Sequence, residues 1–216
     1  MIPINKREKP KVLTDALHEL RSTPSAVVCW GEVRNQRPIR EALCREQGGL
    51  CAYCMRRIDP DSSHVEHIIP QSACEPGQDV AYDNMLAVCD GNEGAGDGSA
   101  LICDRARRDR ALVVNPLKPE TLRGIKYYGN GKIDSDDEAV RKDLNETLNL
   151  NCEAAYLPQN RKAAIEALNE RMKSSASRRS IVSACKKRRD GIEESELKPE
   201  YAGALLYFLD RRIRRG

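Results

Sequence analysis

The chain has 216 residues, and its 36 lysines and arginines nearly balance its 33 aspartates and glutamates, which leaves a formal net charge of +3. So small a charge excludes a protein that binds nucleic acid through net charge alone. The hydrophobic content of 40% is enough for a core in one domain or two small ones, whereas nine cysteines are too few for a disulfide scaffold. No apolar run approaches the ~18 residues that a membrane helix needs.

The first residues and the cysteines predict the compartment. The chain becomes charged within its first nine residues and has no apolar stretch of the kind found in a secretory signal. Without export the cysteines stay reduced, and their odd number also argues against complete pairing. We therefore expect a cytoplasmic protein without membrane contact, in which closely spaced cysteines act as metal ligands.

The N-terminal part of the chain is predicted to be helical. Apolar residues recur at helical spacing over residues 10–21. A second helix is expected over residues 34–47, with Pro38 near its start and glycine at Gly48 after its end. Beyond it the chain changes to short apolar stretches and turn residues, and the four glycines within residues 90–99 predict a loop.

The C-terminal part is predicted to be a hairpin followed by helices. The hairpin covers residues 124–133, with its turn at Asn130-Gly131. Ser135 and Glu138 have the spacing of a capping box that begins a helix. Further helices are expected over residues 135–148, 160–172, 177–189 and 199–212. We divide the chain into an N-terminal helical segment (1–49), a central core (50–123) and a hairpin with a C-terminal helical region (124–216).

Positive charge is concentrated in residues 160–216, which contain 15 basic and 8 acidic residues. The dense clusters in this region are the run Lys186, Lys187, Arg188 and Arg189 and the run R-R-I-R-R of residues 211–215. A solvated helix face and a contact with phosphate or RNA are the two interpretations of such a run.

The strongest local motif is Cys51-Ala-Tyr-Cys54, because two cysteines at this spacing can both bind one zinc ion at ~2.3 Å. A tetrahedral site needs two more ligands, for which Cys89 and Cys103 are the candidates. Thirteen residues separate this second pair, so it is the weaker one, although the glycine-rich loop between them makes the detour possible. A redox pair would need a thioredoxin-like βαβ pattern, which is absent. The other cysteines are interpreted as small buried apolar residues: Cys29, Cys44, Cys74, Cys152 and Cys185.

Two of the three histidines lie between the cysteine pairs, in the segment H-V-E-H-I-I-P of residues 64–70. An acidic residue directly precedes His67, and a proline follows three residues later. Further along, Asn84 begins a short apolar run that ends at Cys89. An isolated histidine is more often structural than catalytic, but this combination favours a catalytic interpretation.

These motifs together resemble an HNH, or ββα-metal, nuclease domain over residues 50–107. In that family a C-x-x-C knuckle precedes a strand with an acidic-His-x-x-Pro motif, a loop supplies an asparagine, and a Cys-His pair opens the last helix. Here the histidine is His67 and the asparagine is Asn84, whereas Cys103-Asp104 replaces the final pair. The resemblance implies an α+β, mostly helical fold: a central ββα-metal core with a structural zinc, its last helix over residues 104–110, flanked by helical regions.

The resemblance also implies catalytic roles. His67 would be the general base, since the ordinary histidine pKa of about 6.5 suits that role at neutral pH. Glu66 and Asp104 would hold a catalytic Mg²⁺ or Mn²⁺, and a carboxylate in place of the usual histidine favours these ions. Asn84 either braces the loop opposite His67 and orients its ring or is itself a metal ligand. His64 is either a supporting group or a surface residue.

Four arginines follow on the same predicted helix. Their side chains would either bind phosphates near the cleft or form a solvated helix face. They are Arg105, Arg107, Arg108 and Arg110.

Softer patterns narrow the resemblance to a subgroup. The opening I-N-K-R-E-K-P, the Asn115-Pro116-Leu117 segment and the hairpin Y-Y-G-N-G-K-I are similar to the HNH proteins of retron and Septu anti-phage systems, the PtuB-like nucleases. The resemblance implies cleavage of DNA or tRNA as an anti-phage effector with a PtuA-like ATPase as partner, and the retron reverse transcriptase with its msDNA as further members of the complex. Arg178, Arg179 and the later basic clusters would meet such partners.

Two alternatives remain open from the sequence. The protein is either a nuclease or a zinc-stapled, non-catalytic adaptor that binds nucleic acid or the ATPase partner. A ribonuclease that uses the 2′-hydroxyl of RNA as its nucleophile would need no Mg²⁺.

Overall fold

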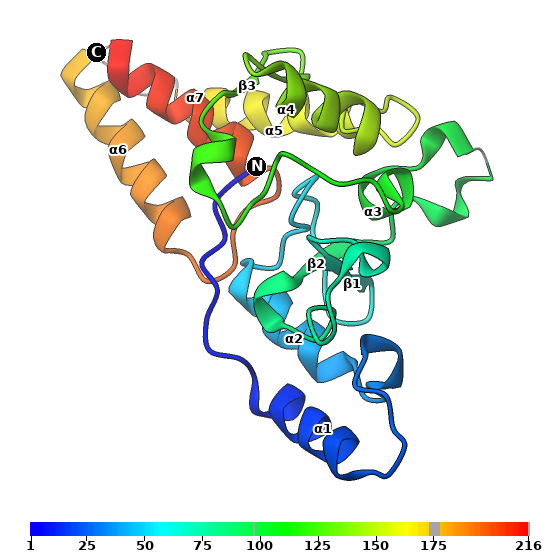
Figure 1. Cartoon of the computed structure of the whole chain (residues 1–216). Helices are drawn as coiled ribbons and strands as arrows, with labels where there is room; N and C mark the ends of the chain where they lie inside the picture. The colour runs from blue at the N-terminus through cyan, green and yellow to red at the C-terminus, as the bar shows by residue number, and fades with distance from the viewer. Residues whose placement is uncertain (97, 173–177, 216) are drawn as a thin grey trace.

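The computed structural model describes residues 1–96, 98–172 and 178–215 of the chain. Helices dominate the described residues, and two small antiparallel sheets are embedded among them (Figure 1). In chain order the main elements are α1 (Lys11–Ser22), α2 (Arg37–Glu46), β1 (Ser63–His67), β2 (Met85–Cys89), α3 (Cys103–Arg107), β3 (Ile125–Tyr127), β4 (Ile133–Ser135), α4 (Glu138–Lys142), a π-helix (Asp143–Thr147), α5 (Leu157–Arg171), α6 (Arg178–Glu194) and α7 (Ala202–Arg215). None of the described helices is long and apolar enough to span a membrane.

The first sheet is the antiparallel pair β1–β2, against which α2 and α3 pack. His67 lies opposite Met85 at one end of the pair, and β2 ends at Cys89 at the other. All of β2 is buried. The buried side-chain amide of Gln47 binds the main chain of β2. Its Nε2 donates to the carbonyl of Ala87 (2.7 Å), and its Oε1 accepts from the N–H of Ala87 (2.7 Å). A side chain therefore satisfies the N–H of Ala87 and shares its carbonyl with the N–H of Ala52 (3.1 Å).

The second sheet is the predicted hairpin, formed by β3 and β4. Gly131 in its turn has φ +84°, and a Cβ at this position would lie 1.8 Å from the carbonyl oxygen of Pro158, so only glycine fits. The buried guanidinium of Arg161 on α5 donates from Nε to the carbonyl of Gly131 (2.6 Å) and from Nη2 to that of Leu150 (2.6 Å). These bonds join the hairpin turn to α5 and to the segment before it.

One hydrophobic core includes residues from all three predicted segments, among them Leu13, Ile39, Leu86, Ile125 and Leu157. A second core lies between α5, α6 and α7 and includes Leu168, Cys185, Ile192 and Leu209. The first residues of the chain run beside α7. Buried side chains from all three segments share the first core. The division at residues 49 and 123 stays a prediction.

Two helices next to the first sheet are shorter than expected. α2 begins at Arg37 rather than at residue 34. The helix expected over residues 104–110 is α3, which ends at Arg107 because Arg108 has φ +54°, a backbone conformation that cannot continue a helix.

The predicted capping box is wrong. Ser135 is the last residue of β4, and the residue that caps α4 is Asp137, whose carboxylate accepts from the N–H groups of Ala139 (2.9 Å) and Val140 (3.0 Å). α4 then continues into the π-helix, which ends at Thr147, close to the expected end of this helix.

The C-terminal helices are present with shifted ends. α5 begins at Leu157 rather than at residue 160, with a proline in its first turn. α6 extends to Glu194 rather than ending at residue 189, and residue 177, its expected start, lies outside the described residues. α7 begins at Ala202 rather than at residue 199.

Candidate functional site

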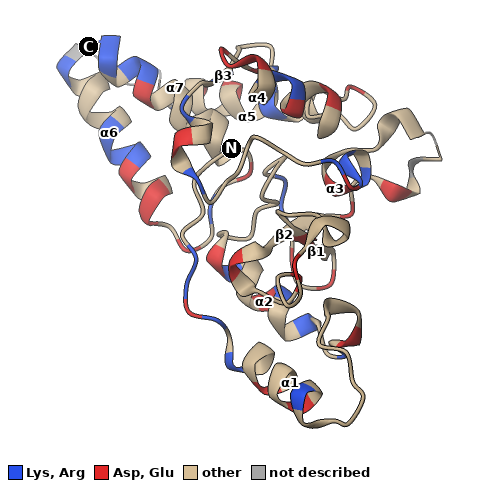
Figure 2. Ribbon diagram, viewed as in Figure 1, with Lys and Arg blue, Asp and Glu red and all other residues tan. Residues whose placement is uncertain are grey.

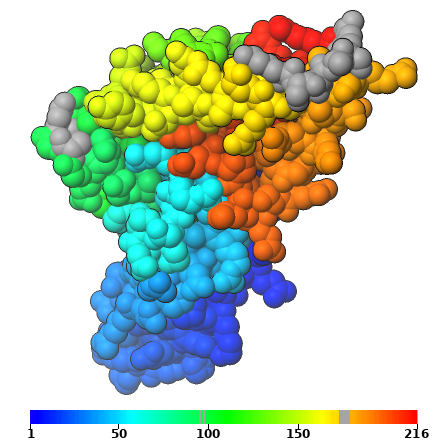
Figure 3. Space-filling view, turned by 180° about the vertical axis from the view of Figure 1, so that it is seen from behind, coloured from blue at the N-terminus to red at the C-terminus, as the bar shows by residue number. Residues whose placement is uncertain are grey.

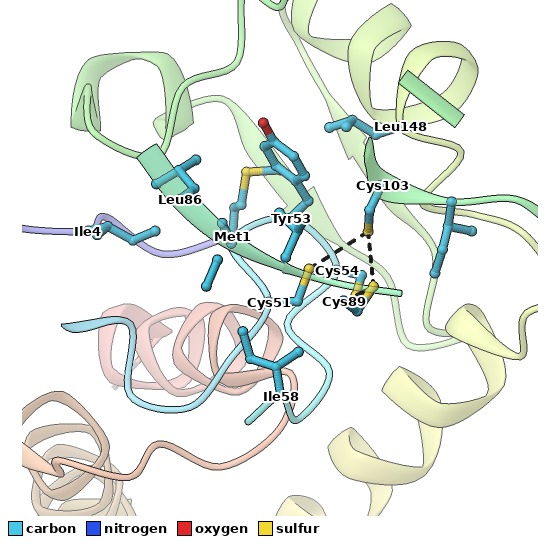
Figure 4. Packing of buried hydrophobic residues seen from close by; sticks show 14 of the residues in the cluster. Met1, Ile4, Cys51, Tyr53, Cys54, Ile58, Leu86, Cys89, Cys103 and Leu148 are labelled. Carbon is cyan, nitrogen blue, oxygen red and sulfur yellow. Dashed lines mark hydrogen bonds between the residues drawn. The ribbon is translucent and has the colours of Figure 1, made fainter. Parts of the chain in front are cut away.

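The four predicted zinc ligands lie together at one end of the first sheet (Figure 4). Their sulfur atoms all lie within 4.8 Å of one another, and all four side chains are buried. The Sγ–Sγ distances are 3.8 Å for Cys51–Cys103, 3.7 Å for Cys54–Cys89 and 3.7 Å for Cys89–Cys103. A tetrahedral site with zinc–sulfur bonds of ~2.3 Å has edges of about 3.8 Å, so the four thiols match the size of a Zn–S₄ centre.

Local main-chain bonds position the two cysteines of the knuckle. The N–H of Cys51 donates to the carbonyl of Arg56 (2.9 Å), and the N–H of Met55 donates to that of Cys51 (3.1 Å). Met55 has φ +65°, which closes this turn tightly. Cys51 and Cys54 therefore point into the same space.

Longer-range contacts position the second pair. Cys89 ends β2, and Cys103 begins α3, where its N–H donates to the carbonyl of Leu148 (2.9 Å) after the π-helix. The loop between them closes on itself, since the N–H of Ile102 donates to the carbonyl of Gly91 (3.0 Å). The structure thus brings the weaker predicted pair to the same place as the knuckle.

The electrostatics of the cluster favour a cation. Hydrogen bonds from the neighbouring thiols of Cys103, Cys51 and Cys54 hold the pKa of Cys89 well below its usual range. Burial raises the pKa of the Cys51 and Cys103 thiols. Arg56 donates to the sulfur of Cys89 (3.5 Å). A bound dication would favour the thiolate form and offset the burial that raises the pKa of the Cys51 and Cys103 thiols.

His67 is buried at the end of β1, with 5% of its surface exposed. Its Nε2 lies 2.7 Å from the carbonyl oxygen of Asp79. A carbonyl only accepts, so Nε2 carries the hydrogen and Nδ1 is left as the atom that can accept a proton. Burial lowers the pKa of His67, which keeps the ring neutral at neutral pH.

Two residues that the sequence did not single out fix this ring. The indole of Trp30 meets the imidazole edge-on at a centroid distance of 5.7 Å. The carboxylate of Asp79 accepts from the main-chain N–H of Trp30 (2.7 Å), so the two neighbours of His67 are hydrogen-bonded to each other. No local signal predicts these contacts, because 49 residues separate Trp30 from Asp79.

Asn84 is buried and braces the loop after β1. Its Oδ1 accepts from the N–H of Ile69 (2.8 Å), and its Nδ2 donates to the carbonyl of Gln78 (3.1 Å). Gln78 directly precedes the residue whose carbonyl holds His67. These contacts support the bracing role that was one of the two expectations, rather than metal binding.

Glu66 belongs to a buried network that joins the knuckle, β1 and α3. Its Oε1 is ion-paired with Arg107 and accepts from the hydroxyl of Tyr53 (3.2 Å). Arg107 also donates to the carbonyls of His67 (2.7 Å) and Ile68 (2.6 Å). Burial raises the pKa of Glu66, and the ion pair opposes that rise. A main-chain hydrogen bond from His67 also opposes this rise, so three residues bind the carboxylate of Glu66.

The predicted phosphate contact on α3 is corrected for one arginine, Arg107. Arg107 is only 1% exposed and its guanidinium is bonded within the protein, so it holds α3 against β1 and does not face a ligand. Arg110 is exposed and donates from Nη2 to the main-chain carbonyls of Ala106 (2.6 Å) and Thr147 (3.1 Å), and its phosphate contact stays a prediction. Arg105 pairs with Glu93 (2.8 Å). Among the described residues Arg108 has an exposed side chain without an ion pair.

Asp104, the second residue of α3, fits a cation site. Its Oδ1 is buried and has no hydrogen-bond partner among the described residues. Burial, with repulsion from Glu66, raises the pKa of Asp104 to about 7. A buried carboxylate oxygen without a donor is chemically suited to a hard divalent cation. Among the described residues the group of metal-ligating side chains that lies together is the four-cysteine cluster, so a Mg²⁺ or Mn²⁺ at Glu66 and Asp104 stays a prediction.

The remaining predicted residues lie elsewhere. His64 is half-buried on β1 and lies opposite Val88, away from the end that carries His67. The run from Lys186 to Arg189 lies on α6, apart from the first sheet, and Figure 2 shows further basic residues near the end of α7. Arg189 is paired with Asp190 (2.8 Å).

Comparisons with known proteins match part of the chain. The "Retron Ec83 putative HNH endonuclease" of Escherichia coli is 34% identical over 84 residues, which cover 33% of this chain and 33% of the relative. The "Retron Vc95 putative HNH endonuclease" of Vibrio cholerae serotype O1 biovar El Tor is 29% identical over 83 residues, 38% of each chain. No protein-family model matches the chain. The matched segment spans only about a third of each relative. These matches support the HNH endonuclease family, and the Septu or PtuB-like subgroup stays a prediction.

Proposed function

We propose that this protein is a metal-dependent HNH endonuclease that hydrolyses phosphodiester bonds in DNA or tRNA as the effector of a retron or Septu anti-phage system. The observation that carries the proposal is the pairing of two features on one β1–β2–α3 unit. His67 is held with one ring nitrogen open, and the buried Oδ1 of Asp104 has no hydrogen-bond partner within the described part of the chain. The names of the two partial relatives point to the same activity.

His67 acts as the general base. The carbonyl of Asp79 fixes the tautomer, so Nδ1 accepts a proton from the attacking water. A bound Mg²⁺ or Mn²⁺ would neutralise charge on the phosphate, and Asp104 with Glu66 would hold it. The buried network around Arg107 keeps α3, which carries Asp104, at a fixed place relative to β1. Hydrolysis of this kind leaves 5′-phosphate and 3′-hydroxyl ends.

Zinc has a structural role in this proposal. The four cysteines join the knuckle, the end of β2 and the start of α3, so one ion would fix β2, which pairs with the strand that carries His67, relative to α3, which carries Asp104. A PtuA-like ATPase, together with the reverse transcriptase and msDNA in a retron, are the proposed partners in the cytoplasm. The small net charge is consistent with a nuclease that relies on local cations, Mg²⁺ or a partner to bind its substrate.

The proposal is tested by incubating the purified protein, alone and with its partner, with plasmid DNA and with total tRNA. We expect cleavage only when Mg²⁺ or Mn²⁺ is present, with 5′-phosphate ends, and no cleavage by His67→Ala although its zinc content is unchanged. Full activity in excess EDTA with zinc still bound would instead indicate attack by the 2′-hydroxyl of RNA.

A non-catalytic adaptor stapled by zinc is the competing function. The ion pair between Glu66 and Arg107 favours it, because this pair occupies one of the two proposed ligands of the catalytic metal. Binding of nucleic acid without cleavage of either substrate under any metal would establish the adaptor.

A further inference from the structure

A hollow of about 600 Å³ lies on α6, away from the proposed catalytic unit. It is bounded by the end of α5, one face of α6 and the segment of residues 195–199. In Figure 3 the yellow α5 and the orange α6 adjoin on the back of the molecule. The volume is within the range of about 300–1,000 Å³ that is usual for small-molecule sites.

Positive charge surrounds this hollow, and none of its described lining residues is acidic. Two of the cations support the main chain. Arg57 donates to the carbonyl of Gly49 (3.0 Å), and Lys198 donates to that of Glu193 (2.9 Å). The other three are Arg171, Lys187 and Arg188, which are exposed and form no ion pair with any residue that the structure describes.

The same hollow has an apolar side. Ala184, Lys187, Arg188 and Gly191 follow one another at helical spacing, so small and cationic residues share one face of α6. A Cβ on Gly191 would meet nothing within 4 Å, which shows that the wall is open there. Buried Met172 and Ile192 complete the apolar surface.

We propose that this hollow binds a phosphorylated ligand of nucleotide size. Three cations without partners are not neutralised by a single carboxylate, whereas a phosphate group presents about two negative charges and several acceptor oxygens. The apolar side would receive the sugar or base. The ligand is either a free nucleotide or the phosphorylated end of a nucleic-acid strand, since both present the same chemistry.

Calorimetric titration of the full chain tests this site without any measurement of cleavage. The probes are ATP, adenosine, a 5′-phosphorylated oligonucleotide and the same oligonucleotide with a 5′-hydroxyl. ATP or the phosphorylated strand binds, and its unphosphorylated counterpart binds at least about tenfold more weakly. Binding of ATP identifies a nucleotide site; binding of only the phosphorylated strand identifies a strand-end site.

The variants separate this site from general attraction to a basic helix. Lys187→Glu with Arg188→Glu weakens binding by about tenfold or more, and Lys187→Gln with Arg188→Gln weakens it less. The matched control is Lys186→Glu, because Lys186 is exposed on the same helix but does not line the hollow. The proposal is overturned if neither phosphorylated probe binds at millimolar concentration, if adenosine binds as tightly as ATP, or if the control loses as much affinity.

Discussion

The β1–β2–α3 unit and the α6–α7 pair use charged residues in opposite ways. In the first, Glu66 and Arg107 are buried and bonded to each other and to the main chain. In the second, the helices meet through apolar residues such as Cys185 and Leu209, and most lysines and arginines remain at the surface. Buried charges hold the first unit in one geometry, whereas exposed charges leave the second free to bind other molecules.

Loss of the zinc site has the largest expected effect on the first unit. Cys103→Ser should abolish zinc binding, measured as zinc per chain by mass spectrometry, and lower the free energy of unfolding by about 5 kcal/mol or more, because structural zinc contributes directly to folding. Cys29→Ser is the control, since Cys29 is half-buried outside the cluster. Full zinc content in Cys103→Ser would show that the cluster is not the metal centre.

The second largest loss of stability is expected from breaking the buried ion pair between Glu66 and Arg107. Arg107→Met should lower the free energy of unfolding in urea by about 3–5 kcal/mol, because Glu66 would be left charged and buried without its partner. The exposed neighbour, Arg108→Met, should change it by no more than about 0.5 kcal/mol. Adding Glu66→Gln to Arg107→Met should recover part of the loss. Equal effects of the two arginine substitutions would contradict the contrast between buried and exposed charge.

Asn84 tests whether the loop brace acts on His67. Asn84→Ala should cost about 1–3 kcal/mol of stability, because the Ile69 N–H and the Gln78 carbonyl lose their partner. It should also lower kcat for cleavage by about tenfold to a hundredfold with little change in KM, through displacement of the loop that positions the ring. In Asn84→Asp the acceptor is kept and the donor lost, so an intermediate effect is expected. An unchanged kcat in a destabilised Asn84→Ala would limit the residue to folding.

The smallest effect on stability is expected from substitutions in the α6–α7 pair. Replacing Lys187 and Arg188 together by glutamine should change the melting temperature by about 2 °C at most, because neither side chain is paired among the described residues. Thermal unfolding measures this directly. A large loss of stability would show that these cations support the fold after all.

The sequence predicted the site better where its information is local. The C-x-x-C knuckle needs only a tight turn, so Cys51 and Cys54 could be assigned from spacing. The approach of Cys103 depends on a bond to Leu148, far along the chain, and no spacing rule contains it. The turn glycine at Gly131 was also recognisable, because its conformation is set by the residue itself.

Neighbouring residues with the same charge could not be separated. Arg107 is buried and Arg108 is exposed, yet a helix of five residues is too short to show an apolar face in the sequence. The contact of His67 with Trp30 and Asp79 was likewise hidden, because it joins segments that are distant along the chain. For the capping box, the spacing of Ser135 and Glu138 was satisfied by chance while Asp137 formed the cap.

The most direct test of the proposed nuclease is the single-turnover rate of Mg²⁺-dependent cleavage by wild type, His67→Ala and His64→Ala. The two histidines lie on the same strand, three residues apart, but only His67 is held by the carbonyl of Asp79. We expect His67→Ala to slow cleavage by about a hundredfold or more and His64→Ala to leave the rate within about twofold of wild type. Equal rates for His67→Ala and wild type would contradict the assignment of His67 as the general base.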